Sequence, residues 1–257
     1  INARLRLFIG PFARQATLWF LIGPSPSVKI EPSPAMSKNN PASSPFHDFA
    51  DQILDLPKGK LATLKIYLGM PVPLQTDDPA LPDNFHLEPL EAKDHARYRA
   101  VFAKVGENWL WFSRLLLDET RLQHELARKG RNAYALVRRN PQNLMFDDVG
   151  LFEIHHGTGV APNTTDESEL AFLGLDMNER AMGLGSILIR KALHAAKVAG
   201  AKRLTLNTCQ LDDPRALGFY QKMGFTVEKL ALEILTDPRH LGLYPKKSAP
   251  HIPLAPL

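Results

Sequence analysis

Two glycines stand where a strand-like segment gives way to a helical one, in the stretch Arg180-Ala181-Met182-Gly183-Leu184-Gly185-Ser186. Glycine lets the backbone approach a ligand closely, and the first turn of a helix has free N–H groups, so an anion such as a pyrophosphate fits there. A dinucleotide fingerprint needs a third glycine where Leu188 stands, and no Gly-Lys-Ser/Thr follows as in a nucleotide P-loop. On these residues alone, a pyrophosphate cradle and a plain tight turn are equal interpretations.

The surrounding pattern predicts strands that alternate with helices, which places the glycine segment between a strand and a long helix. The fold class expected is α/β (α+β), with a mixed sheet. The predicted strands are 62–68, 85–90, 133–138, 149–155, 169–175, 203–209 and 225–235, and the predicted helices are 92–105, 118–129, 186–199 and 214–223.

Two motifs in this order resemble the GNAT acetyltransferases. The run Arg180-x-x-Gly183-x-Gly185 is similar to the R/Q-x-x-G-x-G/A signature of that superfamily. The run Ala216-Leu217-Gly218-Phe219-Tyr220-Gln221-Lys222-Met223-Gly224-Phe225 resembles its second signature, A-x-x-x-Y-x-x-x-G-F. Residues 207–214 are further similar to an uncharacterised bacterial branch. The resemblance covers roughly residues 85–235 and implies a GNAT-type fold, in which helices flank a strongly bent central sheet.

The resemblance also implies acetyl-CoA as cosubstrate. In such enzymes the strand before the first signature splays from its neighbour and pairs with the pantetheine arm, while the loop N–H groups hold the pyrophosphate. Many relatives have Asn where this chain has Asp213, which cannot donate through its carboxylate but could serve as an N-cap before Pro214. The implied cofactor-binding residues are Leu173, Leu175, Arg180, Ala181, Met182, Gly183, Leu184, Gly185, Ser186 and Asp213.

Acetyl transfer to an amine needs a group that takes a proton. Glu169 stands fourteen residues before Gly183, as does the catalytic Glu of the histone acetyltransferase branch. By the same resemblance, Tyr220 protonates the departing thiolate. The structural alternatives are a solvated carboxylate beside Asp166 and Glu167, and a core aromatic.

The reaction expected from the resemblance is direct attack of an amine on the thioester in a ternary complex, with backbone N–H groups near Leu175 stabilising the oxyanion. The acceptor is a small-molecule or peptide amine that the sequence does not specify, and a homodimer is left open. The alternatives are a non-catalytic acyl-CoA-binding or regulatory module, or a transferase of a longer acyl group.

An aromatic segment before these motifs is a candidate for the acceptor site. Trp109, Phe112 and Leu116 share a helical stripe that favours a core role, whereas Trp111 and Arg114 fall off the stripe and could line an acceptor cleft. No metal is expected, because the pair His155-His156 is not accompanied by a metal-binding motif. Cys209 is expected to be a buried thiol and not a nucleophile.

Charge and composition exclude other classes. Residues 1–36 hold four basic side chains against one acidic, so they account for most of the net charge of +4, and nucleic-acid binding is not expected. The single cysteine fits a reducing cytoplasm, and no apolar run is long enough to span a membrane.

We expect a disordered or mis-annotated tail over 1–45, an extension over 46–84, the acetyltransferase domain over 85–240 and a C-terminal tail over 241–257. Met36 is the expected true start.

Overall fold

The computed structural model describes residues 53–140, 144–157 and 166–257. The chain divides into two compact units, Ile1–Pro57 and Lys58–Leu257, and the fold below is that of the second. The tail expected over 1–45 and the protein start expected at Met36 both lie outside the described residues. Within the described part, no helix has both the length and the apolar character needed to cross a bilayer.

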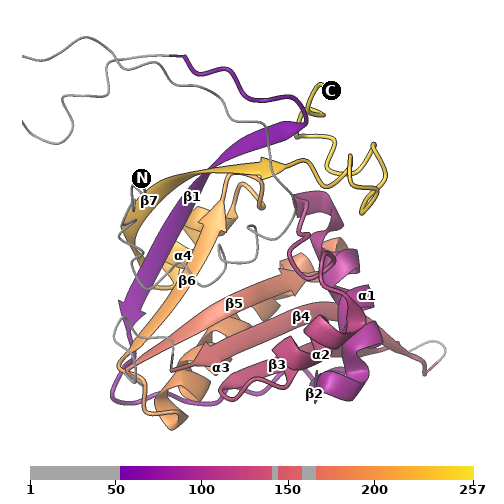
Figure 1. The fold of residues 1–257 in the computed structure, drawn as a ribbon. Coiled ribbons are helices and arrows are strands. Elements are labelled where there is room, and N and C mark those ends of the chain that lie inside the picture. The colour runs from indigo at the N-terminus through magenta and orange to yellow at the C-terminus, as the bar shows by residue number, and fades with distance from the viewer. Residues whose placement is uncertain (1–52, 141–143, 158–165) are drawn as a thin grey trace, which may run out of the picture. The chain divides into compact units, whose positions relative to one another are not determined.

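Seven strands form one mixed sheet in the order β2-β3-β4-β5-β6-β1-β7, which confirms the predicted fold class (Figure 1). The strands are β1 (Lys60–Pro71), β2 (Phe85–Pro89), β3 (Arg131–Arg139), β4 (Phe146–His156), β5 (Glu167–Leu175), β6 (Arg203–Cys209) and β7 (Thr226–Thr236). The α-helices are α1 (His95–Gly106), α2 (Glu119–Leu126), α3 (Leu184–Val198) and α4 (Ala216–Lys222), and 3-10 turns are η2 (Ala92–Asp94), η3 (Glu107–Trp109) and η4 (Met177–Met182).

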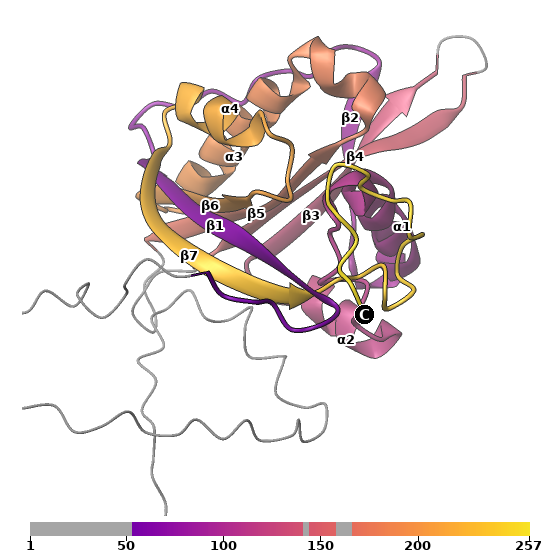
Figure 2. The same cartoon turned by 90° about the horizontal axis from the view of Figure 1, so that it is seen from above.

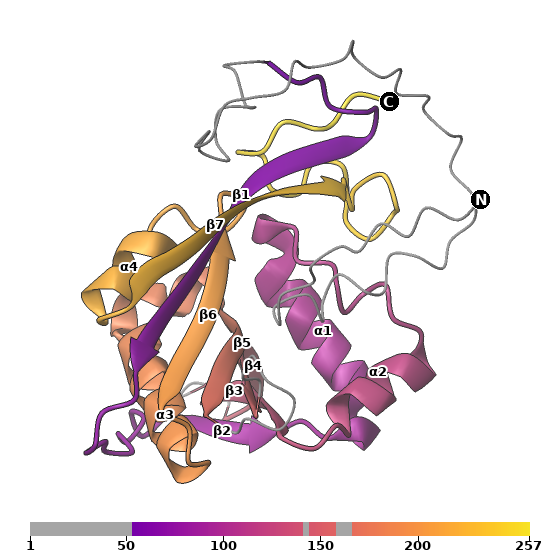
Figure 3. The ribbon, with the colours of Figure 1, turned by 60° about the vertical axis from the view of Figure 1, so that its left-hand side comes forward.

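Helices cover both faces of the sheet (Figures 2 and 3). On the face covered by α3 and α4, here called the α3/α4 face, Leu188 of α3 and Leu204 of β6 belong to one buried core. On the opposite face, the α1/α2 face, Phe102 of α1, Leu122 of α2 and Leu151 of β4 belong to a second core. The two faces of the sheet therefore pack against two separate cores.

Strand β1 lies inside the sheet, between β6 and β7, and runs antiparallel to both. Ile66 of β1 pairs with Thr208 on one side and with Leu230 on the other. Residues 60–71, part of the expected N-terminal extension, thus supply an internal strand beside β6.

The chain after β7 packs without forming a helix or strand. Tyr244 and Ile252 are buried in a third core, and the Tyr244 hydroxyl donates a 2.5 Å hydrogen bond to the carbonyl of Trp111. A buried ion pair organises this segment, because Arg239 donates to Asp237 at 2.8 Å and to the carbonyl of Ile252 at 3.0 Å.

Replacing Arg239 with Met should lower the free energy of unfolding by about 3–5 kcal/mol, because it leaves the fully buried Asp237 without its partner. Urea denaturation followed by circular dichroism measures this change. Arg121→Met is the matched control, since its ion pair with Asp118 is exposed and should be worth less than about 1 kcal/mol. Equal, small changes in both variants would show that the C-terminal segment does not depend on Arg239.

Candidate active site

Strands β5 and β6 diverge where the sequence analysis expects a splay. They run parallel and pair only over residues 167–170 and 203–206. Beyond that point β5 continues to Leu175 beside β4, and β6 continues to Cys209 beside β1 (Figure 1). Among the described residues, the backbone of 171–175 has no strand partner on the β6 side. An extended ligand could pair with that free edge.

A β-bulge in β5 decides which side chains face each surface. In the pairing with β4, Ala171 is an extra residue between Leu170 and Phe172. An extra residue shifts the alternation of a strand by one. Glu169 and Phe172 therefore share the α1/α2 face, whereas Leu170 and Leu173 pack on the α3/α4 core.

The glycine segment forms the junction between η4 and α3. Gly183 has a left-handed φ of 72°, and a Cβ there would meet no atom within 4 Å. The first turn of α3 carries no acidic side chain, so its N–H groups suit an anion. Gly185 has a different role, because a Cβ there would lie 3.2 Å from the Phe219 ring of α4. Leu184 is fully buried in the core, and Met182 is exposed.

Arg180 and Asp213, both expected at the cofactor, bind each other through Nη1 and Oδ2 at 2.7 Å. The Arg180 guanidinium also lies 4.7 Å from the centroid of the Trp109 ring. The pKa of Asp213 lies below its ordinary value, and the main cause is the hydrogen bonding from Arg215. Asp213 also makes the hydrogen bonds of the expected N-cap, because its Oδ1 accepts from the backbone N–H of Arg215 at 2.9 Å and its carbonyl from that of Ala216 at 2.8 Å. The regular part of α4 begins only at Ala216.

Glu169 lies at the start of the splay, on the α1/α2 face. Its side chain is 24% exposed, and its carboxylate accepts a 3.4 Å hydrogen bond from the Asn207 amide of β6. Its other oxygen lies 4.0 Å from Nδ1 of His155. The carboxylate is thus reachable from solvent and can accept a proton.

Tyr220 lies in α4, on the α3/α4 face, where it packs against Phe219 and Phe225. Burial, and then the carboxylates of Asp212 and Asp213, raise its pKa well above that of an ordinary tyrosine. The phenol therefore keeps its proton at neutral pH and can donate it. Glu169 and Tyr220 therefore lie on opposite faces of the sheet.

The helical stripe expected over Trp109, Phe112 and Leu116 is wrong. The turn η3 ends at Trp109, and the next residue, Leu110, has a left-handed φ of 53° that stops the helix. Leu116 is consequently 46% exposed instead of buried.

Trp111 and Arg114, the two candidate acceptor residues, point into the protein. The Trp111 ring packs 5.3 Å from that of Phe172, and its Nε1 donates to Asp212 at 3.0 Å, which joins the two sides of the splay. Arg114 is only 7% exposed and donates to Glu153 at 3.1 Å. Trp111 thus borders the opening, whereas Arg114 lies deeper in the α1/α2 core.

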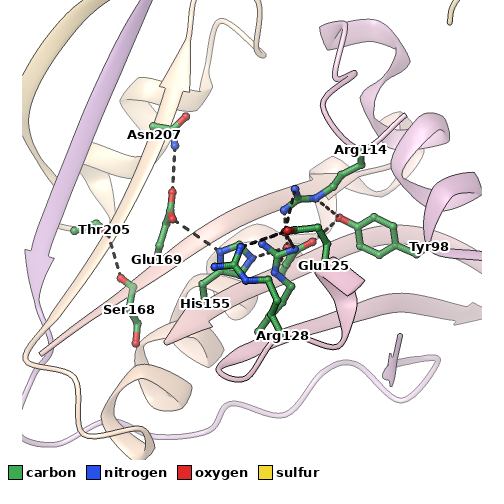
Figure 4. A network of polar contacts seen from close by, with 11 residues as sticks. Tyr98, Arg114, Glu125, Arg128, His155, Ser168, Glu169, Thr205 and Asn207 are labelled. Carbon is green, nitrogen blue, oxygen red and sulfur yellow. Dashed lines mark hydrogen bonds and ion pairs between the residues drawn. The ribbon is translucent and has the colours of Figure 1, made fainter. Parts of the chain in front are cut away.

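A polar network that the sequence did not predict lies behind Glu169 (Figure 4). Glu153 of β4 is fully buried and is contacted by Tyr98, Arg114 and His155. A charged residue inside the apolar run 149–154 is the signal that could have revealed this network.

A sequence model described as the Acetyltransferase (GNAT) family matches residues 114–225, the segment that contains the splay, the glycine segment and α4. Residues 114–225 therefore resemble a GNAT acetyltransferase domain. Strands β1, β2 and β7 lie outside the matched residues of that domain. No curated protein matches the chain.

Solved structures similar to this chain cover it in part. A Drosophila protein has a TM-score of 0.47 and 13% identity over 68% of this chain and 51% of its own. A GCN5-related N-acetyltransferase from Sphaerobacter thermophilus has a TM-score of 0.45 and 11% identity over 68% of this chain and 51% of its own. An aminoglycoside acetyltransferase from an uncultured soil metagenomic sample has a TM-score of 0.45 and 17% identity over 57% of this chain and 91% of its own. The chain spans about half the length of the first two.

Proposed function

We propose that this protein is an acetyl-CoA-dependent N-acetyltransferase that acetylates a small-molecule or peptide amine. The observation that supports it is the splay between β5 and β6, which opens the sheet between Glu169 on one face and Tyr220 on the other. An amine that enters from the α1/α2 face and a thioester that lies along the α3/α4 face would meet in that opening.

The residues at the opening fit acetyl-CoA. The backbone of Leu173 and Leu175 would pair with the pantetheine arm along the free edge of β5. The N–H groups of Gly183, Leu184 and Gly185 would hold the pyrophosphate at the start of α3, where the space beside Gly183 is open. The Ser186 N–H already donates to the Gly183 carbonyl at 3.1 Å. Bound there, acetyl-CoA would supply an activated acetyl thioester.

The protein's own groups support direct attack by the amine. Glu169 would accept a proton from the amine, and Tyr220 would give one to the departing sulfur. Burial, and then the nearby Asp212, raise the pKa of the single cysteine, Cys209, to about 11. That thiol is protonated at neutral pH, which disfavours a covalent acetyl-enzyme.

Two alternatives keep the same cradle: a binding or regulatory module without turnover, and a transferase of a longer acyl group. A module would bind acetyl-CoA and release no thiol with any amine. A longer-chain transferase would turn over butyryl- or octanoyl-CoA faster than acetyl-CoA.

Gly183→Val should weaken acetyl-CoA binding at least tenfold, about 1.4 kcal/mol, because a β-branched side chain at a positive φ would distort and block the cradle. Titration calorimetry measures this loss. Gly200→Val is the matched control: Gly200 closes the other end of α3 with a φ of 79° and equally open space.

Both valines should strain the backbone similarly, so melting temperatures separate stability from binding. Weaker binding in the Gly183 variant alone supports the cradle. Equal affinity in both variants, or binding of NAD or ATP in place of acetyl-CoA, would contradict it.

A further inference from the structure

A buried carboxylate lies behind Glu169 on the α1/α2 face. Glu153 is fully buried in β4, and His155, two residues along, contacts both Glu153 and Glu169. His155 Nε2 is 2.6 Å from Glu153 Oε1, and its Nδ1 is 4.0 Å from Glu169 Oε2. The three side chains form a carboxylate–imidazole–carboxylate series from the core to the splay.

The inner carboxylate, Glu153, is held as an anion. The Tyr98 hydroxyl donates to it at 2.5 Å and Arg114 at 3.1 Å, while Arg131 Nε lies 3.5 Å away. Burial alone would raise the pKa of Glu153, but the Arg114 charge and the His155 hydrogen bond outweigh burial and hold that pKa well below its ordinary value. Burial also raises the pKa of Tyr98, which therefore remains a donor.

The anionic state of Glu153 fixes the tautomer of His155. An ionised carboxylate only accepts hydrogen bonds, so Nε2 of His155 must donate to it. The neutral imidazole then has its lone pair on Nδ1, the atom that faces Glu169. Because the Glu169 side chain is partly exposed, one water molecule can span the 4.0 Å between them.

We propose that His155 is a positioning residue that receives the proton Glu169 takes from the acceptor; this rests on the proposed function. An N–H bond of the attacking amine breaks as an O–H bond forms at Glu169. That O–H bond then breaks as an N–H bond forms at Nδ1 of His155, directly or through one water. Glu169 is again an anion, the imidazolium lies between two carboxylates, and its proton finally leaves to solvent.

The variant that tests this relay is His155→Gln. The glutamine amide can still donate to Glu153 but cannot accept the proton, so kcat should fall at least tenfold while the KM for acetyl-CoA stays unchanged. His156→Gln is the matched control, because His156 bonds Ser168 at 2.8 Å and does not contact Glu169. The assay uses acetyl-CoA with a polyamine, an aminoglycoside and a lysine-containing peptide.

Nitrogen-15 NMR of the imidazole ring gives a readout independent of turnover. The spectrum of wild type, assigned by the signal that His155→Gln removes, should show neutral His155 protonated on Nε2. Protonation on Nδ1 would overturn the relay whatever the activity, and so would full kcat in His155→Gln. Absence of turnover with every amine in wild type, together with the Nε2–H tautomer, would instead count against the proposed function.

Discussion

Replacement of Glu169 by glutamine should lower kcat by roughly 10²–10⁴-fold, because it keeps the shape of the side chain and removes the proton acceptor. Acetyl-CoA affinity should be nearly unchanged, since Glu169 faces the α1/α2 side and the cradle lies on α3. Part of the rate should return at high pH, where an alkylamine loses its proton without help.

A control for this variant lies on the same strand. Glu167→Gln alters a carboxylate two residues earlier that lies 3.2 Å from Arg203, and it should keep kcat within about twofold of wild type. Steady-state kinetics across pH compares the two variants. If both lose rate equally, the effect comes from strand β5 and not from a base at Glu169.

Replacement of Tyr220 by phenylalanine should lower kcat by roughly 10²–10³-fold, again with acetyl-CoA affinity retained, because only the donated proton is removed. Burial and the two neighbouring aspartates raise the pKa of the phenol, so wild type should keep its donor well above neutral pH. High pH should therefore not restore the rate of this variant, in contrast to Glu169→Gln.

Tyr134→Phe serves as the control for loss of a hydroxyl. Tyr134 is half-buried against the same core and packs on Phe152. Its variant should retain kcat. Full kcat in Tyr220→Phe would make Tyr220 a packing residue and leave proton donation to water.

The local pattern of the chain predicted most elements, because amphipathic periodicity reports burial directly. The helix expected over 186–199 is α3, Leu184–Val198, and the strand expected over 203–209 is β6, Arg203–Cys209. Boundaries differ by up to three residues, as at the start of β4, Phe146 instead of 149, and at the end of α2, Leu126 instead of 129.

Long-range pairing was beyond the sequence pattern. The segment 62–68 is predicted as a strand, but nothing local shows that this strand inserts between β6 and β7, more than a hundred residues away. The sequence of the C-terminal segment shows no helix or strand periodicity that would predict its packing. Hydrogen bonds from Arg239 to the carbonyls of Ser248 and Ile252 hold the segment in place.

The sequence predicted only part of the candidate site. The glycine segment and Tyr220 belong to contiguous motifs, so spacing revealed them. His155 faces Glu169 because the two residues pair directly across β4 and β5, a long-range register that the local pattern does not show. The bulge at Ala171 then puts Phe172 on the same face as Glu169. A single extra residue reverses the facing of a strand, and alternation alone cannot show it.

The most direct test of the account is thiol release from acetyl-CoA by wild type with and without each amine. We expect amine-dependent release for at least one acceptor, with one acetylated amine formed per thiol. We also expect intersecting initial-velocity lines, as a ternary complex requires. Tight acetyl-CoA binding without release by any amine, or parallel lines from a covalent acetyl-enzyme, would contradict it.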